Sequence, residues 1–247
     1  INASENSKSY ENITNIISKL INRKIDKSST IVAIGGGITQ DISSFISYIL
    51  YRGINWIFVP TTLLSQGDSC IGSKIAINFM SIKNLLGGYW PPNKVILDNT
   101  FLKTLTKDQI YSGLGEIAHY YYLSNNKNFN YFKKNIMNMK KSSELDYNEI
   151  IKKSLQIKKY FIEKDEFEKK ERIYLNYGHT FAHALEAISN FKIPHGIAVS
   201  MGMHIANYIS FRSGYIKKSE LISYQLPLEI IFNDYQSFKF SPTILLK

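Results

Sequence analysis

The chain has 247 residues, of which 44% are hydrophobic, and its 30 basic and 20 acidic residues give a formal net charge of +10. No apolar run approaches the roughly 18 residues of a membrane span, so the composition predicts a globular protein with a large core and excludes a membrane protein. A single cysteine, Cys70, excludes an intramolecular disulfide framework and is typical of a reducing compartment, which predicts a cytoplasmic location.

The first hundred residues alternate between helical and strand patterns. Apolar residues at helical spacing predict a helix over residues 12–25, and a short apolar run predicts a strand over 29–34. A helix over 43–51 and strands over 56–59 and 94–98 follow. Strands that alternate with helices indicate a parallel sheet.

Beyond residue 104, nearly every long segment up to residue 209 has a helical period, and no strand is predicted there. We therefore expect two domains, an α/β domain over 1–104 and an all-α domain over 105–247. The first residue is not Met and no signal segment opens the chain, so we expect that residues precede Ile1.

The positive charge is scattered along the chain. Lysines are densest between Lys133 and Lys170, where glutamates and aspartates are interleaved with them. A nucleic-acid-binding protein more often has a focused basic patch or a known module, and no such module is recognised here. We therefore expect no nucleic-acid partner. Two interpretations of the charge stay open, a solvated lysine-rich surface and the attraction of an anionic small substrate.

Three of the chain's five histidines lie close together in the sequence. His179 and His183 are four residues apart in a helical segment, so their imidazoles project from one face. His195 stands at the head of the next apolar helical run, and Glu116, an acid among apolar neighbours, could complete a metal site. Zinc accepts such imidazole and carboxylate ligands, and a catalytic site keeps one position open. The alternative is that these are core or capping histidines.

Three glycines, Gly35 to Gly37, follow the first predicted strand directly. Glycines at this position let the backbone approach a pyrophosphate, and the following helix N-terminus favours its negative charge. The string GGGITQD is not the usual GxGxxG fingerprint, and no acid stands at the usual distance. A tight turn is the alternative.

Polar residues interrupt the apolar segments near PTTLLSQGDSCIGSK. Asp68, Lys74, Asn84 and Arg52 are difficult to explain as core residues, because an unpaired buried charge costs several kcal/mol. They are expected to face a site, or to pair with one another in a structural network.

The motifs AIGGGITQD, YRG, FVPTTLLSQGDSCIGSKIAIN, KNLLGGYWPP, SGLGEI, KDE, LNYGHTFAHALE and PHGIAV occur in this order. This series resembles 3-dehydroquinate synthase and its relatives, the sugar-phosphate cyclases, over nearly everything from Ile1 to about Gly214. The resemblance implies a Rossmann-like NAD-binding α/β domain over 1–104, without its first βα unit. A helical metal- and substrate-binding domain with an incomplete C-terminus would follow over 105–247.

The resemblance also implies roles for individual residues. Glu116, His179 and His195 would hold a divalent metal, zinc or cobalt, and His183 would handle a proton. Residues that would contact NAD are Glu5, Lys8, Gly36, Gly37, Asp41, Thr61, Thr62, Lys83, Phe101 and Thr104. Residues that would contact the substrate are Arg52, Asp68, Lys74, Asn84, Lys158, Arg172 and Asn176, with His119 in the place of a family lysine.

The activity implied by the resemblance is that of a lyase of the shikimate pathway. A phosphorylated seven-carbon sugar acid would be oxidised transiently by NAD, lose phosphate and close to a carbocycle. A homodimer is expected from the family.

Several positions depart from the family pattern, namely His119 for a lysine, Phe79 for a histidine, Ile197 for a glutamate and Gln40 for a glycine. These departures leave three alternatives open. The first is a cyclase that acts on sedoheptulose 7-phosphate or another sugar phosphate. The second is an NAD-dependent polyol dehydrogenase of the iron-containing alcohol dehydrogenase type, and the third is a member of the family that binds its cofactor without turnover.

Overall fold

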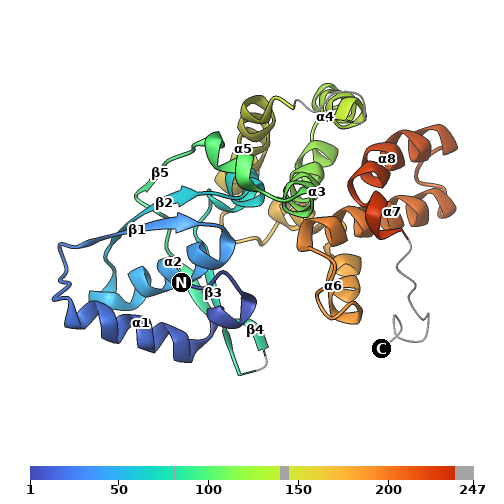
Figure 1. Ribbon diagram of the computed structural model, residues 1–247. Helices are drawn as coiled ribbons and strands as arrows, with labels where there is room; N and C mark the ends of the chain where they lie inside the picture. The colour runs from blue at the N-terminus through green and yellow to red at the C-terminus, as the bar shows by residue number, and fades with distance from the viewer. Residues whose placement is uncertain (81, 140–144, 237–247) are drawn as a thin grey trace. The chain divides into compact units, whose positions relative to one another are not determined.

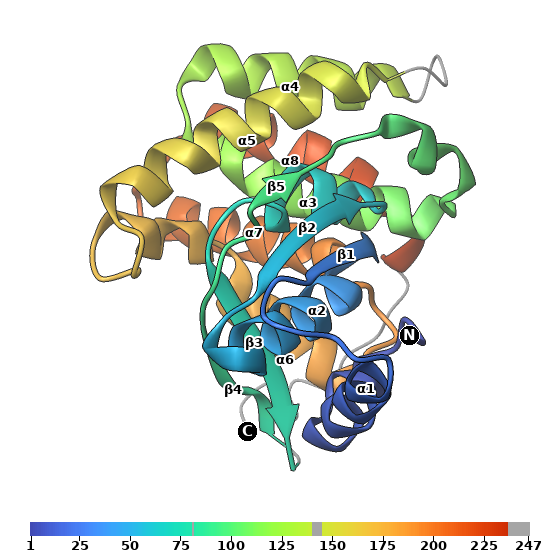
Figure 2. The same ribbon diagram turned by 90° about the vertical axis from the view of Figure 1, so that its left-hand side faces the viewer.

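The computed structural model describes residues 1–80, 82–139 and 145–236. The chain divides into two compact units, unit 1 over Ile1–Thr104 and unit 2 over Leu105–Lys247. Figure 1 labels their helices and strands, and Figure 2 gives a second view of the same elements.

Unit 1 is built from a parallel sheet, an antiparallel hairpin and two helices. Its elements are α1 (Tyr10–Asn22), β1 (Thr30–Gly35), α2 (Gly37–Ile49), β2 (Asn55–Pro60), β3 (Lys74–Phe79), β4 (Ile82–Tyr89) and β5 (Lys94–Val95).

The parallel sheet has the strand order β1-β2-β5, so β2 is central. Ile31 pairs with Trp56, and Ile57 pairs with Lys94. The strand predicted over 94–98 is shorter than expected. It ends because the Asp98 carboxylate accepts hydrogen bonds from the backbone N–H and the hydroxyl of Thr100, which turns the chain.

The antiparallel hairpin of β3 and β4 was not predicted from the sequence. Lys74 pairs with Tyr89 and Ile77 with Leu86, and the register is irregular between Ile77 and Phe79. Most residues of β4 are exposed, so this strand lacks the alternation of apolar and polar residues that identifies a half-buried strand.

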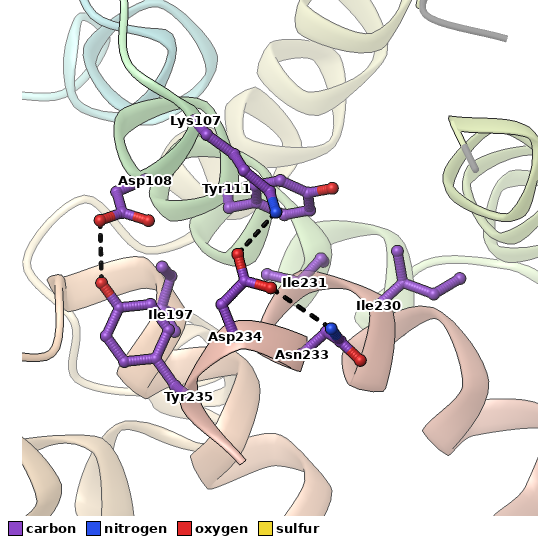
Figure 3. Close-up of a pocket in the computed structure, with 9 residues that line it drawn as sticks. All are labelled: Lys107, Asp108, Tyr111, Ile197, Ile230, Ile231, Asn233, Asp234 and Tyr235. Carbon is purple, nitrogen blue, oxygen red and sulfur yellow. Dashed lines mark hydrogen bonds and ion pairs between the residues drawn. The ribbon is translucent and has the colours of Figure 1, made fainter. Parts of the chain in front are cut away.

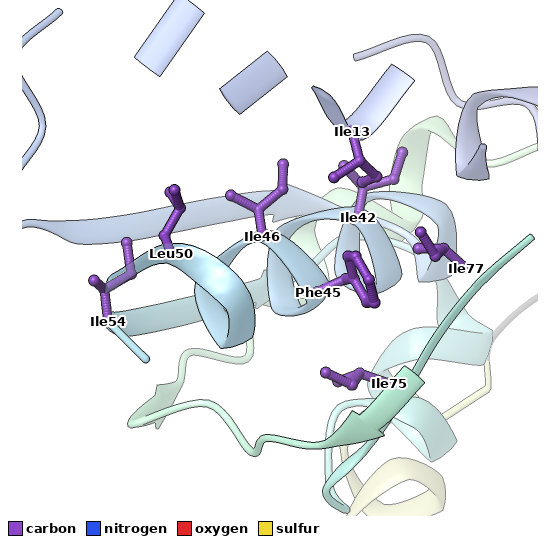
Figure 4. Close-up of a cluster of buried hydrophobic side chains, with 8 residues drawn as sticks. All are labelled: Ile13, Ile42, Phe45, Ile46, Leu50, Ile54, Ile75 and Ile77. Carbon is purple, nitrogen blue, oxygen red and sulfur yellow. The ribbon is translucent and has the colours of Figure 1, made fainter. Parts of the chain in front are cut away.

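Helix α2 contacts β1 and β2 of the parallel sheet as well as β3 of the hairpin. The core of unit 1 therefore gathers around this helix, as Figure 4 shows. Its members are the buried side chains of Ile13, Ile42, Phe45, Ile46, Leu50, Ile54, Ile75 and Ile77. Because α2 follows β1 almost directly, the triple glycine lies between the end of β1 and the N-terminus of α2.

Unit 2 is helical. Its helices are α3 (Lys107–Leu123), α4 (Asn126–Met139), α5 (Tyr147–Lys164), α6 (His179–Ile188), α7 (His195–Arg212) and α8 (Lys218–Ile231). Among its described residues, 105–139 and 145–236, no strand occurs. The α/β unit followed by a helical unit confirms the predicted fold class.

Helices α3 and α7 form the centre of unit 2. Helix α7 contacts α3, α6 and α8, and α3 also contacts α4 and α5. Helix α3 begins at a capping box, in which the Thr106 hydroxyl accepts from the N–H of Gln109 and the Gln109 side chain accepts from the N–H of Thr106. None of the described helices combines the length and the apolar character needed to cross a membrane.

Candidate metal centre and nucleotide-binding loop

Three side chains from three helices of unit 2 meet at one point. Glu116 of α3, His179 of α6 and His195 of α7 each offer a ligand atom, and these atoms lie within 4.8 Å of one another. His179 Nε2 is 3.6 Å from Glu116 Oε1, and His195 Nε2 is 3.3 Å from Glu116 Oε2.

Close backbone packing brings these helices together. A Cβ atom on Gly196 would lie only 1.7 Å from the carbonyl oxygen of Ser112, so only glycine allows α7 to approach α3 this closely. The N–H of Gly196 also donates to the Ser112 hydroxyl at 3.1 Å. Since Gly196 follows His195, and Ser112 lies one turn before Glu116 on α3, this contact sets the two ligand side chains beside each other.

Residue 179 is placed by the start of α6. Gly178 precedes it with φ of +85°, a left-handed conformation that favours glycine, and α6 begins at His179 itself. The sequence NYGHTF therefore encodes a backbone turn at Gly178, and this turn places the His179 imidazole in the first turn of α6.

Electrostatic interactions among the members of the cluster shift their pKa values. Burial raises the pKa of the Glu116 carboxyl, but the imidazoles of His179 and His195 outweigh it and hold this pKa well below the usual range. Burial lowers the pKa of His195, but Glu116 and Glu186 outweigh it and raise this pKa to about 10. The pKa of His179 is likewise raised, because Glu116 outweighs burial.

The three residues fit a zinc-type ion in both chemistry and spacing. Two imidazoles and one carboxylate are a ligand set that zinc accepts, and a fourth position stays available. Bonds of about 2.0–2.2 Å to a tetrahedral ion would separate two ligand atoms by about 3.3–3.5 Å. In the cluster, His179 Nε2 lies 3.6 Å from one Glu116 oxygen and His195 Nε2 lies 3.3 Å from the other, and one ligand atom from each residue lies within 4.8 Å of the other two. Glu116 Oε2 is buried and makes no hydrogen bond of good geometry, as expected for an atom that serves an ion.

Two further histidines lie beside the cluster but outside the group of three. His183 is exposed one turn after His179, and its ring centroid is 5.8 Å from that of His179 and 6.2 Å from that of His195. His119 is buried, with 1% of its surface exposed, and its Nδ1 lies 3.6 Å from Glu116 Oε1.

Two of the predicted substrate-binding residues of unit 2 are buried cations. Lys158 on α5 and Arg172 are both largely inaccessible, and the Arg172 guanidinium donates to the carbonyl of Glu166. Asn176 is exposed, and its side-chain amide donates to Glu168 at 2.6 Å.

The glycine loop of unit 1 has the geometry of an anion-binding turn. Gly36 caps the N-terminus of α2, and a Cβ atom on Gly37 would meet no atom within 4 Å, so the approach to this helix end is open. Thr61 lies next to the loop, since its N–H donates to the carbonyl of Gly35 at 2.9 Å. Thr62 also lies against the loop, because a Cβ atom on Gly36 would lie 2.9 Å from the methyl group of Thr62.

A buried lysine links several predicted cofactor- and substrate-binding residues of unit 1. Lys8 Nζ is 2.7 Å from Asp41 Oδ2 and 3.0 Å from Asn84 Oδ1. Glu5 joins this group through Asn78, whose side-chain amide donates to Glu5 at 2.8 Å. An open pocket of about 570 Å³ is lined by Lys8, Asp41, Lys74, Ile75, Ala76, Asn84, Leu85, Gly87, Gly88 and Tyr89.

The remaining predicted residues of unit 1 lie mostly at the surface. Arg52, Lys74 and Lys83 are exposed, and Asp68 is half-buried in a π-helical turn, Ser65–Ser69. Thr104 is exposed and Phe101 is half-buried, on the 3-10 helix Asn99–Thr104. The polar residues around the PTTLL segment therefore do not carry the cost of a buried charge, which corrects the premise on which their roles were predicted.

Sequence reasoning missed several polar residues that support these groups. Glu186 is 3.1 Å from His195 Nδ1, and Asn78 accepts from the N–H of Asn84 at 2.9 Å. Gln40, noted only as a departure, is buried and donates to the carbonyl of Ser69, which ties the glycine loop to the π-helical turn. The position of Glu186, seven residues after His179 on one helix, was the one signal available in the sequence.

Unit 2 also contains a pocket of about 200 Å³ near the start of α3 (Figure 3). Ile197, which replaces a family glutamate, lies on its wall with Ile230 and Ile231. Its charged groups are paired with neighbours, Lys107 with Asp234 at 2.6 Å and Asp108 with the Tyr235 hydroxyl at 3.0 Å. The pocket is therefore lined by isoleucines and by polar groups that are paired with one another.

Comparison with known proteins identifies the family. The family model described as 3-dehydroquinate synthase N-terminal matches residues 1–112, and the one described as 3-dehydroquinate synthase C-terminal matches residues 113–234. The 3-dehydroquinate synthase of Dictyoglomus thermophilum is 41% identical over 218 residues, which cover 88% of this chain and 61% of that protein. The chain thus spans about 61% of the length of this relative.

A longer match and a solved structure agree with this result. The 3-dehydroquinate synthase of Campylobacter concisus is 37% identical over 245 residues, which cover 93% of this chain and 69% of that protein. The crystal structure of 2-deoxy-scyllo-inosose synthase complexed with carbaglucose-6-phosphate, NAD+ and Co2+ superposes with a TM-score of 0.88 at 28% identity, covering 99% of this chain and 67% of that one. On these matches, the chain belongs to the 3-dehydroquinate synthase family.

Proposed function

We propose that the chain acts as a phosphate-eliminating cyclase on a phosphorylated seven-carbon sugar acid, with NAD and a divalent ion as cofactors. The observation that carries this proposal is the convergence of Glu116, His179 and His195 in a chain of the 3-dehydroquinate synthase family. The proposal places the reaction in the cytoplasm, in keeping with a sequence whose single cysteine, Cys70, forms no disulfide, and takes the active form to be a homodimer as expected of the family.

When bound, NAD supplies reversible hydride transfer and the divalent ion supplies Lewis acidity toward a substrate hydroxyl. Glu116, His179 and His195 would hold the ion, and the negative charge of Glu116 would compensate part of its charge. His183 is exposed one turn from His179, so its imidazole is placed to accept or return a proton.

The loop of Gly36 and Gly37, at the N-terminus of α2, would bind the pyrophosphate of NAD. In unit 1, Lys8 fixes Asp41 and Asn84 in one hydrogen-bonded group, so their side chains are oriented before a ligand arrives. Thr61, Thr62, Lys83, Phe101, Thr104 and Glu5 are the further proposed NAD contacts.

Cationic side chains bind the anionic groups of the substrate in this proposal. Lys158 and Arg172 of unit 2 are buried, and a buried cation gains most from a fixed anionic partner such as a phosphate or a carboxylate. Asn176 of unit 2 and Arg52, Asp68 and Lys74 of unit 1 are the further proposed substrate contacts. His119, which stands in the place of the family lysine, is a further proposed substrate contact and lies beside Glu116.

The experiment that tests the proposal measures phosphate release from the seven-carbon acid phosphate by the purified protein with zinc and sub-stoichiometric NAD. We expect many turnovers for each NAD and no accumulation of NADH, because the hydride returns to the product in each cycle. A His195→Ala variant serves as the control and should release no phosphate.

Other outcomes would contradict the proposal in distinct ways. Phosphate release from sedoheptulose 7-phosphate alone would show a cyclase with a different substrate. A stoichiometric rise in NADH with a simple polyol would show a dehydrogenase. Binding of NAD and zinc without turnover of any of these compounds would show a member of the family that has lost catalysis.

A further inference from the structure

His195 is contacted by a carboxylate on each side of its imidazole ring. Its Nε2 lies 3.3 Å from Glu116 Oε2, and its Nδ1 lies 3.1 Å from Glu186 Oε1. Glu186 comes from α6, seven residues after His179, so both side chains project from the same face of this helix. The Glu186 side chain is 13% exposed, so little water competes for it.

Among the three members of the cluster, His195 is the one that packing restrains least. Its side chain is 37% exposed, compared with 14% for His179 and 6% for Glu116. It is also the first residue of α7, where Pro194 precedes it with an extended backbone. A ring in this position can rotate about its side-chain bonds unless a polar partner holds it.

A hydrogen bond at Nδ1 restrains both the rotation and the tautomer of the ring. If Nδ1–H donates to the Glu186 carboxylate, the lone pair of Nε2 is left to bind an ion. The same contact raises the basicity of Nε2 toward the ion. Carboxylates in this position are common partners of metal-binding histidines.

We propose that Glu186 is a positioning residue of the metal centre, which orients His195 and holds it in the tautomer that presents Nε2 to a divalent ion. This inference rests on the proposed function, because it needs an ion at Glu116, His179 and His195. It adds a residue that the motif of metal-binding side chains does not contain.

The chain offers a matched control for this pair. His204 and Glu229 form another imidazole–carboxylate pair, on α7 and α8, in which His204 Nδ1 is 3.9 Å from Glu229 Oε1. Neither residue belongs to the metal cluster. Glu229 is more exposed than Glu186, at 43% against 13%, and a Glu229→Ala variant removes a histidine-facing carboxylate from the same unit while it leaves the proposed metal centre intact.

The test compares wild type, Glu186→Ala, Glu186→Gln and Glu229→Ala in two measurements. Zinc affinity is measured by competition with a chromophoric chelator, and the ligand field is followed by the visible absorption spectrum of the Co2+ form. In Glu186→Ala we expect zinc affinity to fall about 10- to 100-fold and the Co2+ spectrum to change. Glu186→Gln should bind more tightly than the alanine variant, because its carbonyl still accepts from Nδ1–H, and Glu229→Ala should match wild type.

Circular dichroism of the metal-free variants verifies that each one is folded, and Glu186→Gln carries the test if Glu186→Ala is not. Wild-type affinity and an unchanged Co2+ spectrum in the folded Glu186 variants would overturn the role of Glu186 while the metal centre stands. An equal loss in Glu229→Ala would also overturn it, since the effect would not be specific. Failure of the wild type to bind zinc or Co2+ would instead refute the proposed metal centre, and this inference with it.

Discussion

Glu116, His179 and His195 each offer a ligand atom, and these atoms lie within 4.8 Å of one another. In the proposed metal centre each residue would supply one of three protein ligands, so the loss of any one would leave the ion incompletely held. We expect Glu116→Ala, His179→Ala and His195→Ala to lose stoichiometric zinc, as measured by elemental analysis after gel filtration.

His183→Ala is the control for this series. His183 is exposed and lies outside the group of three, so its removal should leave one zinc per chain and slow turnover. Stoichiometric zinc in all three ligand variants, or loss of zinc in His183→Ala alone, would contradict the assignment.

At the level of single residues, the sequence allowed part of the candidate site to be predicted. The spacing of His179 and His183 placed both on one face, but spacing could not distinguish them, because the choice depends on how α6 meets α3 and α7. The contact of Glu186 with His195 depends on the same packing, and the sequence spacing places Glu186 only on the face of α6 that carries His179. Lys8 is similar, since its partners Asp41 and Asn84 are distant in the sequence.

At the level of helices, the contact of α3 with α7 controls the metal cluster. Gly196→Ala would place a Cβ atom 1.7 Å from the Ser112 carbonyl oxygen, so the helices must separate. We expect this variant to lose about 3 kcal/mol of unfolding free energy, at the upper end of the usual cost of overpacking, and to bind zinc weakly. Urea unfolding and chelator competition measure the two effects.

Gly37→Ala is the control for this substitution. It also changes a glycine in the first turn of a helix, but its Cβ atom would meet nothing within 4 Å. We expect zinc affinity to match wild type and stability to change little. Equal effects in both variants would show that close helix contact at Gly196 is not the cause.

The packing of α7 on α8 predicts a dependence of stability on pH. Burial lowers the pKa of His204 below its ordinary value of 6.5, although Glu229 opposes this effect. The groups that face His204 are Glu229 and Gln225 of α8 and the ring of Phe232, which follows the last residue of this helix. The folded state therefore binds the proton less readily than the unfolded state does, and stability is lost as pH falls from about 6.5 through the lowered pKa.

His204→Gln removes this titration while it retains a polar side chain. We expect the difference in urea midpoint between wild type and His204→Gln to shrink as pH is lowered from 8 to 5, because the contribution of the neutral imidazole disappears. A difference that stays constant over this range would contradict the lowered pKa.

The elements themselves were predicted unevenly. The helices α1, α6 and α7 and the strands β1 and β2 follow from apolar periodicity and from the turn residues that flank them. The hairpin of β3 and β4 escaped prediction because β4 is largely exposed, and exposed strands carry no apolar signal. Strand β5 was predicted too long, since the turn at Asp98 depends on a side-chain hydrogen bond.

At the level of the whole molecule, the order of the sequence motifs indicated the family, whereas the composition did not. The net charge of +10 left the class of partner open, whereas eight motifs in one order indicated a family that the comparisons then confirmed. Some positions, such as His119 and Ile197, depart from the family pattern. At these positions the motifs do not indicate which substrate the chain uses. In the structure, the His119 imidazole lies beside the Glu116 carboxylate, a contact that the sequence did not predict.

The three members of the metal cluster come from three different helices, α3, α6 and α7, and this has a consequence for folding. An ion held by Glu116, His179 and His195 would act as a cross-link between three helices, and the unfolded chain has no preformed site for it. Zinc at about 1,000 times its dissociation constant should therefore add about 4 kcal/mol to the free energy of unfolding. Calorimetry should show a melting temperature that falls on addition of a chelator and recovers with zinc, while His195→Ala shows no response to either.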